Sequence, residues 1–176
     1  MRKLEYFPNL VTMFFTRAAE KGDAPFLWRK QDGAWHAISW AEAARQVASL
    51  SRGLRATGLQ RGDRVMLVAE NRPEWCIADL AIMAAGCVTV PTYTTNTERD
   101  HAHIIENSGA RAIIVSTQKL AATLMPAGDI ASYHELWHVE ASFRMSKTDL
   151  RARPIFSHTR EAIEAHLTIV FAALAI

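Results

Sequence analysis

The sequence has few cysteines and no long apolar run. Cys76 and Cys87 are its only cysteines, and they form no Cys-x-x-Cys pair. Two isolated thiols are typical of small buried residues in a reducing compartment, so we expect a cytoplasmic protein without a disulfide framework. The longest apolar run, residues 167–176, has ten residues. A helix that spans a membrane needs about 20, so we expect no transmembrane segment.

Other common signals are also weak or missing. The first ten residues, MRKLEYFPNL, are basic but have no apolar stretch behind them, so we expect no signal peptide. The formal net charge of +2 does not point to nucleic acid or to an acidic partner. Hydrophobic residues make up 49% and charged residues 22%, which is typical of a globular domain with a core.

Residues 1–127 alternate between β-like and helical patterns. A helical pattern over 9–21 is followed by two short runs around Asp32-Gly33, which predicts a hairpin. The segment SWAE at 39–42 predicts a capping box that opens a helix. After it come three β-rich runs separated by two helical ones, the second with Thr97 as its expected cap: RVMLVAE, CVTVP and RAIIVST. This order predicts an incomplete, open, partly parallel α/β sheet with covering helices.

These same runs resemble a known family. The motifs GDRV, ENRPEW, AGCVTVP and HIIENSGA occur in one order along residues 5–126. This region resembles the N-terminal part of AMP-forming acyl-CoA synthetases, in particular long-chain fatty-acid–CoA ligases. The resemblance implies an enzyme ancestor that adenylates a fatty acid with ATP and Mg²⁺ and then transfers the acyl group to coenzyme A.

The machinery that this chemistry requires is not found in the 176 residues. A Gly/Ser/Thr-rich phosphate loop that ends in Pro-Lys-Gly is needed so that backbone N–H groups face the triphosphate. The nearest candidate, TYTTNT at 92–97, has no glycine and no lysine after it, and we interpret it as a strand exit that leads to a helix cap. The resemblance therefore assigns no catalytic or cofactor-binding residue, and we expect the chain alone to bind no cofactor and to be catalytically incompetent.

Residues 128–176 have a different character, with two helical patterns that predict an all-α two-helix tail. Tyr133, Glu140 and Lys147 lie seven residues apart, so they share one helical face. The segment resembles the C-terminal part of the catalytic domain of DDE-type insertion-sequence transposases, although Leu136 stands where the signature has Arg. The resemblance implies that Glu140 is a metal-binding carboxylate and that Tyr133 and Lys147 contact DNA.

A transposase needs more carboxylates than this segment offers. Two metal ions cannot be held by Glu140 alone, so we expect this remnant to be inert. The basic stretch 144–160 leaves open an alternative in which the remnant still binds DNA through phosphate contacts. We therefore predict two parts, residues 1–127 from a ligase and residues 128–176 from a transposase, joined as a gene fusion.

The segment HELWH at 134–138 offers a third alternative. His-Glu-x-x-His places two imidazoles on one helical face, as in zinc peptidases, with Glu135 as general base. A five-residue motif is weaker than the longer transposase-like pattern around it, so we interpret His134 and His138 as helix residues and predict no metal site. We also expect the α/β part to expose a sheet face and a sheet edge, and hence to fold poorly.

Overall fold

The computed structural model describes residues 5–124 and residues 168–171. The helices and strands follow one another in the order α1 (Leu10–Lys21), β1 (Pro25–Gln31), β2 (Ala34–Ser39), α2 (Trp40–Ala56), β3 (Arg64–Val68), α3 (Pro73–Ala84), β4 (Val88–Thr92), α4 (Glu98–Ser108), β5 (Ala112–Val115), α5 (Gln118–Leu124) and β6 (Thr168–Phe171). Among these described residues, no helix is both long and apolar enough to cross a membrane.

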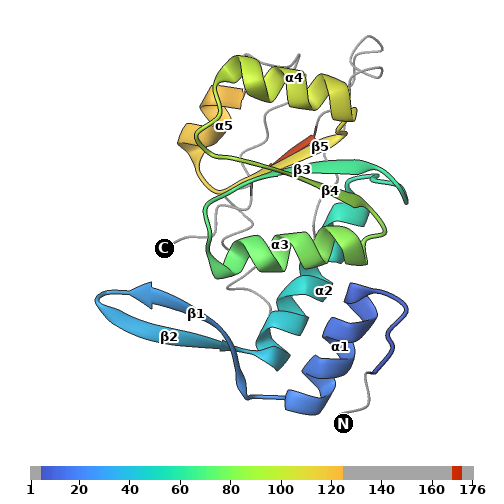
Figure 1. Cartoon of the computed structure of the whole chain (residues 1–176), viewed down its shortest axis with the longest axis vertical. Helices are drawn as coiled ribbons and strands as arrows, with labels where there is room; N and C mark the ends of the chain where they lie inside the picture. The colour runs from blue at the N-terminus through green and yellow to red at the C-terminus, as the bar shows by residue number, and fades with distance from the viewer. Residues whose placement is uncertain (1–4, 125–167, 172–176) are drawn as a thin grey trace.

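The main sheet is parallel and has the strand order β4-β3-β5-β6. Strand β3 lies between its two neighbours, with Met66 opposite Val90 on one side and Ile113 on the other. The alternation of strands and helices confirms the predicted α/β class. Strands β1 and β2 form a separate antiparallel hairpin that projects to one side of the molecule (Figure 1).

Helices cover both faces of the sheet. Val65 and Leu67 of β3 pack in one core cluster with side chains of α2 and α3. Met66 and Val68, which point the other way, pack in a second cluster with side chains of α4 and α5. The three layers are visible in Figure 1, where α4 and α5 lie on one side of the strands and α2 and α3 on the other. The expectation of an exposed sheet face is therefore wrong for the central strands, because both of their faces are buried.

A third cluster joins α1 and the hairpin to the outer side of α2 and α3. Its aromatic centre includes Phe14, whose ring lies 5.8 Å from that of Phe26 and 6.0 Å from that of Trp40. The rings of Phe26 and Trp40 are 3.8 Å apart. This cluster anchors the base of the hairpin, where β1 begins and β2 ends, and leaves its far end free to project.

The predicted turn and caps are present, with one difference. Asp32 and Gly33 both have positive φ, as the hairpin turn requires. Thr97 and Asp100 form a complete capping box at α4. At α2 the Ser39 hydroxyl accepts the Glu42 N–H at 3.1 Å, but the Glu42 carboxylate pairs with Arg45 and Gln46. The expected capping box at 39–42 is thus only half formed. The Glu42 carboxylate accepts hydrogen bonds from the side chains of Arg45 and Gln46 instead of from the Ser39 N–H.

The end of the chain departs from the predicted two-helix tail. Residues 168–171 form strand β6, which pairs in parallel with β5. The sequence Thr-Ile-Val-Phe consists of β-branched and aromatic residues, which favour strands. A run as short as this one cannot be assigned to a helix or to a strand by periodicity alone. The helix prediction was therefore wrong for these four residues.

Candidate functional site

The carboxyl ends of β3 and β5 form the topological switch point of the sheet. Strand β3 leads through α3 to β4 on one side, and α4 returns the chain across β3 to β5 on the other side. Helices α3 and α5, which follow the two adjacent strands, lie on opposite faces of the sheet. In open parallel sheets such a divergence opens a crevice beyond the strand ends, and ligands bind there. This edge is therefore the candidate site.

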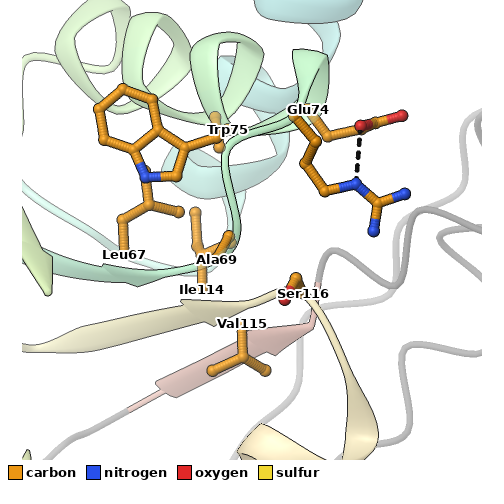
Figure 2. A pocket seen from close by; sticks show the side chains of 9 residues that line it. Leu67, Ala69, Glu74, Trp75, Ile114, Val115 and Ser116 are labelled. Atoms are coloured by element: carbon orange, nitrogen blue, oxygen red, sulfur yellow. Dashed lines mark hydrogen bonds and ion pairs between the residues drawn. The ribbon is translucent and has the colours of Figure 1, made fainter. Parts of the chain in front are cut away.

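A small cavity lies at that point. Its walls come from the end of β3, the start of α3 and the end of β5, including Leu67, Ala69, Trp75, Ile114 and Ser116 (Figure 2). Its volume is about 10 Å³, which corresponds to roughly one water molecule. The cavity marks the position of the crevice, but a substrate would not fit inside it.

A buried carboxylate borders the cavity at the start of α3. Glu74 is only 7% exposed, and its two oxygens face Arg72 Nε at 3.1 Å and an Arg29 terminal nitrogen at 3.4 Å. The Arg72–Glu74 bond is drawn as a dashed line in Figure 2. A carboxylate in the first turn also interacts favourably with the helix dipole. Glu74 therefore ties the hairpin, through Arg29, to the strand end where the candidate site lies.

A second carboxylate lies at the end of β3. The Ser116 hydroxyl is the main cause that lowers the pKa of Glu70 below its ordinary value of 4.5, and Arg72 acts in the same direction, while partial burial opposes both. Ser116 Oγ itself is buried, and within the described residues no group meets the geometric criteria for a hydrogen bond with it. The site edge thus includes a glutamate whose pKa is lowered by its surroundings.

The Thr-rich segment after β4 has the structure that we expected for it. Strand β4 ends at Thr92 and α4 begins at Glu98, with Thr97 as its N-cap. Within the loop, Asn96 Nδ2 donates to Thr92 Oγ1 at 2.9 Å. The interpretation as a strand exit and helix cap is therefore confirmed.

The site residues predicted from the tail lie outside the described residues. These are Glu140, Tyr133 and Lys147 of the transposase-like segment, and His134, Glu135 and His138 of the zinc motif, and they stay predictions. Within residues 5–124 no three His, Cys, Asp or Glu side chains are grouped closely enough to hold a metal ion. Sequence reasoning missed the Glu74 pairing, because Arg29 lies 45 positions away and no periodic pattern links the two.

Comparison with known proteins shows the family. The AMP-binding enzyme family matches residues 14–158. The chain belongs to the AMP-binding enzyme family. The match includes the whole of the described sheet except β6 and extends past the predicted boundary at residue 127. Together with the curated relatives described next, this match confirms that the N-terminal region resembles AMP-binding acyl-CoA ligases.

The curated relatives that match the chain include acyl-CoA ligases and synthetases. Long-chain-fatty-acid–CoA ligase FadD15 of Mycobacterium tuberculosis is 33% identical over 135 residues, which cover 76% of this chain and 22% of that protein. The human mitochondrial acyl-coenzyme A synthetase ACSM5 is 35% identical over 117 residues, with 62% and 20% covered. This chain thus spans about a fifth of the length of the relatives that it matches.

Solved structures show the same fold. NpsA of Klebsiella oxytoca, in complex with 3-hydroxyanthranilyl-AMSN, superposes with a TM-score of 0.58 at 28% identity, over 64% of this chain and 22% of that one. IdnL1 superposes with a TM-score of 0.60 over 65% of this chain and 23% of that one, at 18% identity, which supports the fold alone. These matches confirm the α/β fold of the described residues.

Proposed function

We propose that residues 1–127 are the N-terminal part of a long-chain fatty-acid–CoA ligase, in which ATP adenylates a fatty acid that is then transferred to coenzyme A. The observation that carries the proposal is the match to FadD15, 33% identical over 135 residues. The switch-point edge around Glu70, Arg72 and Ser116 supports it, because an open sheet of this kind presents ligands at that edge. ATP, Mg²⁺ and coenzyme A would be the ligands of the whole ligase, which would work in the cytoplasm.

The described residues would serve this reaction as a scaffold. The cavity of about 10 Å³ is too small for a nucleotide or an acyl chain, and the 176 residues contain no loop of the Pro-Lys-Gly type. We therefore assign no catalytic residue within 5–124, and the isolated chain would not make acyl-CoA. Its contribution would be to hold one edge of the site, with Glu74 and its two arginines fixing the start of α3.

A segment exchange tests this proposal. The segment of the Mycobacterium tuberculosis relative that matches residues 14–124 is replaced by those residues, and the formation of palmitoyl-CoA from palmitate, ATP and coenzyme A is measured. The proposal predicts that the exchanged enzyme folds and keeps measurable activity. A second exchange that carries Leu67→Ala is the matched control and should lose activity together with stability. A folded exchange protein without activity would contradict the proposal.

We propose for residues 128–176 the origin inferred from the sequence, a transposase remnant joined to the ligase part. The seven-residue spacing of Tyr133, Glu140 and Lys147 supports it, whereas the family match that continues to residue 158 weighs against a boundary at 127. Single-molecule sequencing of the source DNA past codon 176 decides between a gene fusion and an uninterrupted ligase gene. A ligase reading frame that continues into a Pro-Lys-Gly loop would refute the fusion.

Two activities of the tail are open to direct tests. DNA binding through the basic stretch 144–160 would appear as a salt-dependent gel shift that Arg151→Ala and Arg153→Ala abolish. A zinc peptidase would bind one zinc ion per chain and lose it in His134→Ala. Observations on the described residues favour neither activity, and the ligase proposal does not depend on them.

A further inference from the structure

The hairpin of β1 and β2 has two faces of opposite character. On one face, Leu27 and Ile38 pack in the third core cluster. Arg29 lies on the same face and pairs with Glu74 at the start of α3. Because the side chains of a strand alternate between its two faces, the residues between these positions point away from the body of the molecule. The hairpin itself projects to one side (Figure 1), so its second face is turned to solvent.

Two indoles and one ammonium group occupy this second face. The register pairs Trp28 with Ala37 and Lys30 with Trp35, so these four residues form one surface, here called the Trp face. All four are exposed, Trp28 to 53% and Trp35 to 64%. Such exposure is unusual for two tryptophans on one small surface, and exposed apolar surface that is rimmed by polar groups marks an interaction site.

The exposed indole area is too small for a stable protein partner. A tryptophan offers about 250 Å² at most, so the two exposed fractions amount to roughly 300 Å². A specific protein interface buries about 800 Å² on each partner. At a lipid surface, by contrast, each indole binds by itself, because its ring lies against the acyl chains while its N–H stays among the headgroups.

The charge of the Trp face favours an anionic surface. Lys30 is its only charged side chain and lies directly opposite Trp35. A lysine stem can lie along apolar surface while its ammonium group stays in the polar layer, where anionic lipid attracts it. The only carboxylate in residues 25–39 belongs to Asp32, which lies in the turn and not on this face.

We propose that the Trp face docks on an anionic lipid surface, with Trp28 and Trp35 at the depth of the headgroups and Lys30 against the lipid phosphates. The aromatic cluster and the Arg29–Glu74 pair fix the opposite face of the hairpin, so the Trp face is presented without rearrangement. The proposal uses only residues of the hairpin and does not depend on the ligase function.

The test is sedimentation of the 176-residue chain with sucrose-loaded vesicles made of equal parts of phosphatidylcholine and phosphatidylglycerol, and with vesicles of phosphatidylcholine alone. Trp35→Ala and Lys30→Ala change the Trp face. Tyr93→Ala and Lys119→Ala are their matched controls, because they remove an exposed aromatic side chain and an exposed lysine away from the hairpin. Circular dichroism checks that each variant is folded.

A second readout reports on the hairpin itself, because the sequence from 128 to 176 contains a basic stretch and an apolar run. In chains that carry Trp137→Phe, quenching of tryptophan fluorescence by brominated lipid measures contact between the remaining indoles and the acyl chains. Quenching should be lost when Trp28→Phe and Trp35→Phe are added. It should persist in Trp75→Phe, which changes an indole at the cavity of the candidate site.

The chain should bind the mixed vesicles at least about fivefold more tightly than phosphatidylcholine alone. Trp35→Ala should weaken binding roughly tenfold or more, because the burial of its exposed area is lost, and Lys30→Ala roughly fivefold, while both controls bind as the unchanged chain does. Absence of binding at millimolar lipid, or unchanged binding and quenching in the variants of the Trp face, would overturn the proposal. A dimer that Trp35→Ala abolishes, without vesicle binding, would assign the face to a second copy of the chain and overturn it as well.

Discussion

The central strands and the hairpin are built in opposite ways. Strands β3 and β5 are buried on both faces, and from Val65 to Val68 every side chain is fully inaccessible. The hairpin exposes residues 34–37 to solvent and depends on contacts at its base and on Arg29. The sheet is therefore stabilised by burial, whereas the hairpin is positioned by an ion pair and an aromatic cluster.

The largest difference between the two regions should appear when a side chain is truncated. Leu67→Ala should destabilise the chain by about 2–5 kcal/mol, because a fully buried leucine is replaced by a cavity between β3 and the α2/α3 layer. Trp35→Ala, which removes a larger but exposed side chain, should change stability by less than about 0.5 kcal/mol. Urea unfolding of both variants measures this. Equal losses would contradict the division into core and projecting hairpin.

The ion pair of Glu74 should matter more than the exposed pairs on the helices. Glu74→Gln should cost about 1–3 kcal/mol, because a buried carboxylate loses its charge-assisted bonds to two arginines. Arg45→Ala, which breaks the exposed pair with Glu42, is the control and should cost less than about 0.5 kcal/mol. Thermal unfolding compares them. If the control loses as much stability as Glu74→Gln, burial does not set the strength of the pair.

A buried histidine on the α4 side of the sheet should make stability depend on pH. Burial lowers the pKa of His101 below its ordinary value of 6.5, although Asp100 opposes the shift. Below pH 6.5 the unfolded chain therefore binds a proton that the folded chain does not. Stability should fall as the pH drops from 6.5 toward the folded pKa, with a slope of up to about 1.4 kcal/mol per pH unit.

Variants identify the residue responsible. His101→Leu should flatten this slope, while the exposed His36→Gln should leave it unchanged. Glu42 and Glu70, whose pKa values are lowered, lose their contribution only below pH 4.5 and so fall in a separate window. Urea unfolding between about pH 5 and 7 measures the slope. A slope that persists in His101→Leu would rule out His101 as its source.

The smallest effect concerns a helix cap. Thr97→Ala should cost about 1 kcal/mol, because the N-cap oxygen that accepts the Asp100 N–H is lost. Thr95→Ala, in the same loop but outside the cap, should cost almost nothing. The denaturant midpoints of the two variants measure these losses of stability. Equal midpoints would mean that the capping box contributes no stability.

Local patterns predicted the elements that are fixed by nearby residues. The turn at Asp32-Gly33, the cap at Thr97 and the apolar runs of β3 and β5 all depend on a few adjacent side chains, and each is present. The Arg29–Glu74–Arg72 contacts join distant positions through tertiary packing, so no local pattern shows them. The wrong helix prediction at 168–171 has another cause, since a short apolar run is compatible with both a helix and a strand.

We propose that this chain is the scaffold part of a fatty-acid–CoA ligase and that it makes no product alone. The most direct test is ATP-dependent formation of palmitoyl-CoA by the purified 176-residue chain, with Mg²⁺, palmitate and coenzyme A in excess. We predict a rate equal to that of the reaction without protein. Product that accumulates in proportion to the chain, and that disappears when ATP is omitted, would contradict it.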